Sequence, residues 1–167
     1  MYSIGQYISY GNNGVCEVVG TREIEAPQPG AGSKMCYILR PLHDKTCTIT
    51  TPVDNRKVIM RDLISPEETR QLLADIPGIE TLPDQSARQQ ELSYQKALHS
   101  GDCKQWICLV KTLSCRIRSR RANGKKVTAT DDRYFKAATE KLTEEFSVVL
   151  GIGKDETEEM LKDAFSE

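Results

Sequence analysis

The residues best suited to chemistry are six cysteines and two histidines. The cysteines stand at positions 16, 36, 47, 103, 108 and 115, and the histidines at positions 43 and 99. Structural zinc sites usually draw their ligands from closely spaced pairs, and no Cys-x-x-Cys pair occurs here. The N-terminus has no basic start and no apolar signal core, so we expect reduced thiols in a cytoplasmic protein, without a bound metal. Disulfides in a secreted protein are the alternative.

Motifs of catalysis and cofactor binding are missing from the chain. It contains no G-x-S-x-G, no G-x-x-x-x-G-K-[ST] and no G-x-G-x-x-G. A Cys–His pair needs only to meet in space, so a cysteine-dependent or metal-dependent enzyme remains an alternative. We expect a non-enzymatic protein with no cofactor, no small-molecule substrate and no membrane partner.

Positive charge is concentrated in one segment. The chain has a net charge of −1, whereas residues 104–136 contain ten Lys and Arg against two Asp, a net charge of +8. Such a block can bind the phosphate backbone of nucleic acid without reading bases. The alternative is a solvated helix face whose charges pair with the acidic C-terminal helix, Asp155 to Asp163; residues 137–167 as a whole carry a net charge of −6.

The first 65 residues contain five segments typical of strands. These segments are rich in β-branched and aromatic residues, and turn signals such as Gly11-Asn12-Asn13-Gly14 separate them. The expected strands cover residues 2–10, 15–24, 35–39, 46–51 and 58–64. Short strands at this spacing indicate a small barrel or a strongly bent sheet.

From residue 65 the pattern becomes helical. Residues 65–68, Ser-Pro-Glu-Glu, predict a capping box with proline at the first helical position. We expect helices over about 66–76, 84–99 and 103–118, a fourth helix capped by Thr130, and a short acidic helix at the end. Trp106 belongs to the apolar repeat of the third helix, which favours a core position over a functional surface. The chain is predicted to be α+β, with domains 1–65 and 66–167.

Several short motifs follow one another in a characteristic order. They are IGQYISYGNNGVC at 4–16, TPVDN at 51–55, MRDL at 60–63, LHSGD at 98–102 preceded by Tyr94, VKTL at 110–113, and GKKV at 124–127 followed by DRY at 132–134. Their order and the β-then-α layout resemble the CarD/CdnL/TRCF family of bacterial transcription regulators, and the resemblance spans nearly the whole chain.

The resemblance implies a Tudor-like or SH3-like five-stranded β-barrel that binds the β subunit of RNA polymerase, partly by strand-to-strand pairing. An all-α domain of about five helices would follow, contacting promoter DNA near the upstream edge of the bubble and modulating open-complex stability. The expected polymerase-binding residues are Arg22, Arg40, Ile49 and Thr50. The expected DNA-binding residues, which would make largely sequence-independent backbone contacts, are Arg88, Arg116, Arg118, Arg120, Arg121, Lys125 and Lys126. An adapter that binds polymerase without touching DNA, its helical domain binding a protein, is the alternative.

The sequence departs from the family at one position. Many members carry a tryptophan near the start of the second helix of the helical domain, which wedges into the minor groove. Residues 79–94 contain no tryptophan, and Trp106 lies on the third helix. Leucine and proline also act as wedges in other DNA-binding proteins, so one of them could replace it.

Overall fold

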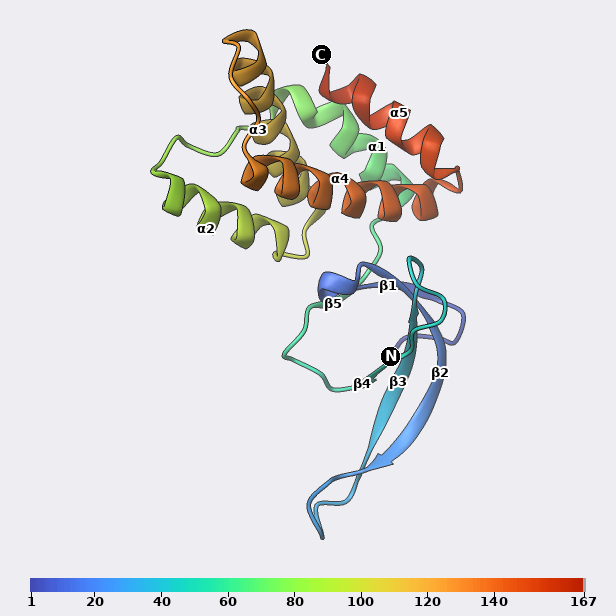
Figure 1. The fold of residues 1–167 in the computed structure, drawn as a ribbon. Coiled ribbons are helices and arrows are strands. Elements are labelled where there is room, and N and C mark those ends of the chain that lie inside the picture. Colours follow the sequence, from blue (N-terminus) through green and yellow to red (C-terminus); the bar gives the residue numbers. More distant parts are fainter. Residues whose placement is uncertain (167) are drawn as a thin grey trace. The chain divides into compact units, whose positions relative to one another are not determined.

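The computed structural model describes residues 1–166, which form two compact units (Figure 1). The first unit is Met1–Leu63 and consists of strands, whereas the second begins at Ile64 and consists of helices. The division lies close to the boundary at residue 65 that the sequence indicates.

The first unit is a five-stranded antiparallel sheet, as expected. Its strands are β1 (Tyr7–Tyr10), β2 (Val15–Glu25), β3 (Ser33–Pro41), β4 (Ile49–Pro52) and β5 (Met60–Asp62). Their order across the sheet is β4-β3-β2-β1-β5, so β4 and β5 are the outer strands. The first, fourth and fifth strands are shorter than the sequence suggests, since turns and loops occupy residues 2–6, 46–48 and 58–59.

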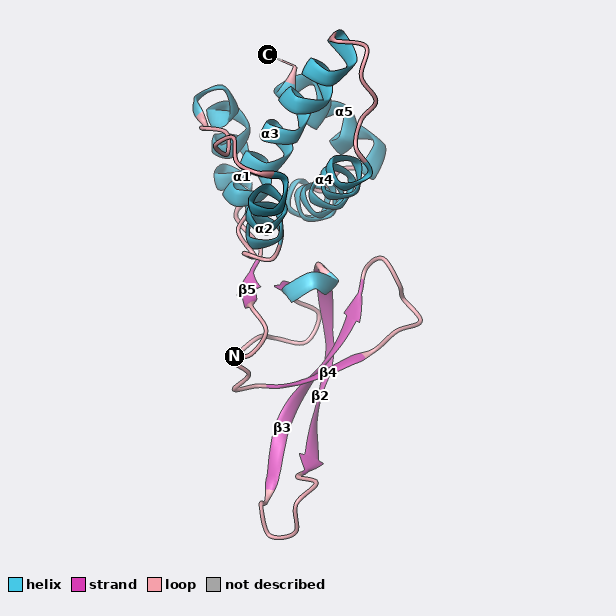
Figure 2. Cartoon of the chain, turned by 60° about the vertical axis from the view of Figure 1, so that its left-hand side comes forward, coloured by secondary structure: helices cyan, strands magenta, loops and turns pink. Residues whose placement is uncertain are grey.

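The hairpin of β2 and β3 dominates this sheet and curves strongly (Figures 1 and 2). A register shift between Val18 and Gly20 marks a bulge, which bends a strand and increases its twist. The curvature wraps one face around a small core that includes Ile8, Val18 and Leu39, each fully buried.

The second unit contains five α-helices. They are α1 (Pro66–Asp75), α2 (Ala87–Leu98), α3 (Cys103–Ala122), α4 (Ala129–Leu150) and α5 (Lys154–Phe165). The predicted capping box is confirmed: the Glu68 amide donates to Ser65 Oγ at 3.1 Å, and the Ser65 amide donates to Glu68 Oε2 at 3.3 Å.

Two expected helix ends are wrong. Helix α3 continues past Arg118 to Ala122, because arginines favour helix and stabilise its negative C-terminal end. It ends where Gly124 adopts a φ of +70°. Helix α4 is capped by Thr128 rather than Thr130, since the Asp131 amide reaches the Thr128 hydroxyl at 3.1 Å.

Trp106 lies in the core of the helical unit, which confirms the sequence prediction. Its side chain is 2% exposed, and its indole N–H donates to the Leu98 carbonyl at 3.0 Å. The ammonium of Lys141 lies 5.5 Å from the centre of the indole ring. This tryptophan therefore joins α3 to the end of α2 and to α4.

Residues 1–166 contain neither a membrane-spanning helix nor a cluster of metal ligands. No described helix is both long enough and apolar enough to cross a membrane. No group of three or more His, Cys, Asp and Glu among these residues is placed to hold a metal ion. The six cysteines are free thiols, so the helices and the sheet are held together without disulfides.

Because Trp106 fills the core, its truncation should destabilise the protein. We expect Trp106→Ala to lower the free energy of unfolding of the helical unit by ~3–5 kcal/mol, the usual loss for a buried aromatic side chain. Urea unfolding followed by circular dichroism measures this change. Leu92→Ala on the exposed surface of α2 is the control and should change it by less than ~0.5 kcal/mol. Equal midpoints for the two variants would contradict the core assignment.

Candidate functional site

The register of the sheet places three of the four expected polymerase-binding residues on one face. Arg22 of β2 pairs with Cys36 of β3, Arg40 of β3 pairs with Glu17 of β2, and Thr50 of β4 pairs with Ile38 of β3. Side chains of directly paired residues point to the same side, and the sides alternate along each strand. Arg22, Arg40 and Thr50 are all exposed and lie on the face opposite the core.

Ile49 points to the other face of the sheet. It pairs with the buried Leu39 and is half-buried against the core of the sheet. Its position on β4 still places it at the sheet edge, because β4 is an outer strand that pairs with β3. An outer strand has unpaired backbone groups on one side, where an extended segment of another protein can add a strand.

A hollow adjoins this exposed face at the end of β4. It has a volume of about 410 Å³, and Ile24, Lys34, Cys36 and Pro52 line it together with the loop between β2 and β3. These four residues lie on the same face as Arg22 by register. The face therefore combines exposed cations, an open strand edge and an apolar recess, which the sequence alone did not indicate.

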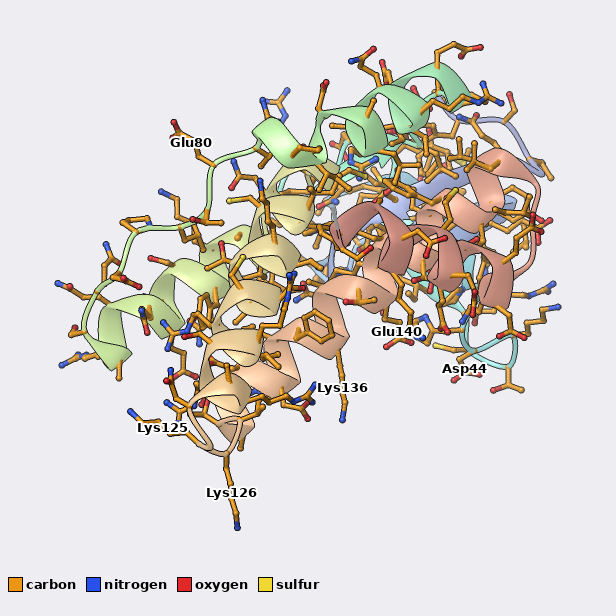
Figure 3. All side chains as sticks on the ribbon, turned by 90° about the horizontal axis from the view of Figure 1, so that it is seen from above. Asp44, Glu80, Lys125, Lys126, Lys136 and Glu140 are labelled. Atoms are coloured by element: carbon orange, nitrogen blue, oxygen red, sulfur yellow. The ribbon has the colours of Figure 1, made fainter. Side chains whose placement is uncertain are left out.

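The expected DNA-binding cations gather at one end of the helical unit. Arg120 and Arg121 lie in the last turn of α3, and Lys125 and Lys126 lie in the turn that leads to α4. Figure 3 shows Lys125 and Lys126 pointing outward from this turn. We call Arg121, Lys125 and Lys126 the basic turn, because all three are exposed and form no ion pair within residues 1–166.

Arg116 is different, because a buried carboxylate holds it. Its Nε lies 3.4 Å from Oδ2 of Asp131, and the Asp131 side chain is only 4% exposed. Arg118 and Arg120 also have partners inside the unit: the Phe165 carbonyl at 3.3 Å and the Lys126 carbonyl at 2.7 Å. The structure thus divides the sequence cluster into cations with internal partners and the basic turn.

No ion pair among the described residues joins this cluster to the acidic last helix. The ion pairs of the basic segment within the described part of the chain involve Asp131 and Asp132 of α4 and Glu91 of α2, and none of these carboxylates lies on α5. The alternative of pairing with the acidic last helix therefore has no ion pair to support it among the described residues.

Helix α2 adds an exposed stripe that sequence reasoning missed. Arg88, Leu92 and Lys96 follow one another at four-residue spacing and therefore share one helix face. Leu92 is 57% exposed, so the stripe carries one large apolar side chain between two cations. The spacing is visible in the sequence, but the exposed side of α2 becomes known only once its buried residues, Tyr94 and Ala97, are placed.

A buried group of side chains connects this helix to the basic end of α3 and α4. Tyr94 of α2 is buried, and its ring centre lies 5.5 Å from that of Tyr134 on α4. Burial and, after it, the negative charge of Asp131 raise the pKa of Tyr94 to about 12, whereas Arg116 opposes the rise. Arg133 of α4 also pairs with Glu91 of α2 at 3.0 Å. These contacts hold α2 beside the ends of α3 and α4.

The raised pKa of Tyr94 predicts a pH dependence. In an unfolded chain tyrosine titrates near ~10, whereas in the folded protein Tyr94 stays neutral up to about 12. Folding therefore favours the neutral phenol, and the stability that it contributes is complete below pH ~10 and falls as the pH rises toward 12. Thermal unfolding between pH 9 and 12 should show this loss, and Tyr94→Phe should reduce it. An identical pH dependence in Tyr94→Phe and in Tyr7→Phe, an exposed control, would refute the assignment.

Comparison with known proteins identifies the first unit. A family model described as the CarD-like/TRCF RID domain matches residues 2–64, which include all five strands and the exposed face described above. No curated protein matches the chain. The helical unit from Ile64 onward lies almost entirely outside the matched residues. Domains of this family interact with RNA polymerase, so the chain has a transcription-related function. Residues 2–64 are therefore a CarD-like/TRCF RID domain.

Proposed function

We propose that this protein binds the β subunit of RNA polymerase with its sheet and contacts promoter DNA with its helical unit, thereby modulating the stability of the open complex. The observation that carries the proposal is the exposed face of the RID domain, where Arg22, Arg40 and Thr50 lie beside the open edge of β4. The protein acts by binding and has no catalytic role of its own.

The polymerase contact would use β4 as a template for strand addition. Backbone hydrogen bonds along the free edge of Ile49–Pro52 would give affinity, and the flanking side chains would give specificity. Arg22 and Arg40 place two cations on the face next to this edge, which favours an acidic partner surface. The opposite edge, β5, has only three residues and offers a shorter template.

The DNA contact would combine the basic turn with the exposed stripe of α2. The basic turn presents three cations to the phosphate backbone, and each phosphate that they neutralise releases counterions. On α2, Arg88 and Lys96 flank Leu92, so an apolar side chain stands between two phosphate-binding groups. This arrangement suits an apolar wedge in the minor groove. Leu82 is a poorer candidate, since it packs against the helical core.

The polymerase contact is tested by reversing one charge. Arg22→Glu should weaken binding of the whole chain to the isolated β subunit by roughly tenfold, which corresponds to ~1.4 kcal/mol. Biolayer interferometry at two salt concentrations measures this loss. Arg56→Glu, in the exposed loop before β5, is the matched control and should bind as wild type does. Unchanged affinity in Arg22→Glu would remove this residue from the interface, and no binding by wild type would remove the β subunit as partner.

The DNA contact is tested by the salt dependence of binding to a promoter fragment. Replacing Arg121, Lys125 and Lys126 by Ala should lower affinity, because fewer counterions are released on binding. It should also flatten the slope of log affinity against log salt by ~0.9 for each phosphate that is no longer neutralised. Leu92→Ala should also lower affinity, but it should leave the slope unchanged, because no counterion release depends on it.

Exposed cations of the first unit provide the control for this experiment. The triple variant Lys45→Ala, Arg56→Ala, Lys57→Ala removes the same charge and should retain the wild-type slope. A wild-type protein whose weak DNA binding does not respond to salt would exclude a phosphate contact. The protein would then be an adapter that binds polymerase without DNA.

A further inference from the structure

The helical unit has an apolar groove that the proposed function does not use. It lies between α3, α4 and α5 and has a volume of about 540 Å³. We call it the α3–α5 groove. Its apolar lining consists of Val110, Ile117, Phe135, Leu142, Leu161 and Phe165. Phe135 and Phe165 are only partly buried, so this apolar surface continues to the outside of the unit.

The groove is long rather than round. On α3 its lining runs from Val110 to Arg121, and on α4 it runs from Asp132 to Leu142. At ~1.5 Å per residue, each wall is about 15 Å long, or roughly three helical turns. A compact small molecule would fill only part of this length. A partner helix of two to three turns would fill it and place side chains one turn apart along its floor.

The rim of the groove is positively charged. It carries the cations of Arg118, Arg121, Lys136 and Lys162 against the carboxylates of Asp132 and Glu158. Asp132 is already paired with Lys136 at 2.9 Å, and Figure 3 shows Lys136 pointing outward from α4. Arg121 and Lys162 are exposed and form no ion pair within residues 1–166. An occupant therefore meets an apolar floor and two unpaired cations.

We propose that the α3–α5 groove binds a short amphipathic, acidic helix of a protein partner. Two or three large apolar side chains of that helix would enter the groove, and flanking Asp or Glu would pair with Arg121 and Lys162. DNA fits this surface poorly, because it has no apolar side chains to cover the floor. A second copy of this chain also fits poorly, because Leu161 and Phe165 of its acidic helix α5 are already packed in their own unit.

A selection from displayed peptides tests the chemistry of the occupant. Random peptides of about twelve residues, enough for roughly three helical turns, are selected on the whole wild-type chain. Binders are then counter-selected on Ser114→Trp, in which an indole replaces the small, half-buried side chain that lines the groove on α3. The double variant Arg121→Glu, Lys162→Glu provides a second loss of function if Ser114→Trp fails to fold. Lys45→Glu, Lys57→Glu reverses the same charge on exposed residues of the first unit and is the matched control.

We expect the groove-dependent peptides to be acidic and to carry large apolar residues at helical spacing. Their affinity should fall roughly tenfold or more in Arg121→Glu, Lys162→Glu and less than about twofold in the control. Peptides in which Lys replaces Asp and Glu should lose binding. The proposal is overturned if no peptide depends on the groove, or if the selected peptides are neutral or basic. It is also overturned if wild type is a dimer that Ser114→Trp makes monomeric, since the groove would then join two copies.

Discussion

Helix α4 buries the carboxylates of Asp131, Glu144 and Glu145, and the helical unit depends on how such groups are partnered. Glu145 is 1% exposed, and its oxygens accept the Ile64 amide and the Cys103 thiol, each at 3.2 Å. Asp131, near the start of the same helix, pairs with Arg116. A buried charge without partners costs several kcal/mol, so these partners stabilise the folded unit. Helix α4 therefore fixes the beginning of the unit and both ends of α3.

This constraint also decides which cations remain available to a ligand. Arg116 is held by Asp131, and both charges also act on the phenol of the buried Tyr94 on α2. We infer that Arg116 positions the helices, whereas the basic turn is the part that would bind DNA in the proposed function. The three helix ends are thereby held together before any ligand arrives, and a surface ordered in advance binds without the entropic cost of ordering it.

Local patterns predicted most of the fold, and contacts distant in sequence account for what was missed. The capping box at Ser65 and the apolar repeat around Trp106 depend on neighbouring residues, so the sequence contains them in full. The pairing of Arg116 with Asp131 depends on how the turn after α3 places α4 against it, and residue spacing alone does not specify that geometry. Exposure of Leu92 likewise depends on which face of α2 the unit buries. The α3–α5 groove requires three helices side by side, so it has no signature in any one of them.

Arg121 connects the two proposed activities of the helical unit. It belongs to the basic turn that would face phosphates, and it also lines the rim of the α3–α5 groove. An acidic helix in the groove would use this cation and lower the positive potential around Lys125 and Lys126. DNA and the acidic helix would then oppose each other's binding, and this opposition must be equal in both directions. On these proposals, a protein partner could weaken the hold on promoter DNA while leaving the RID domain on the polymerase.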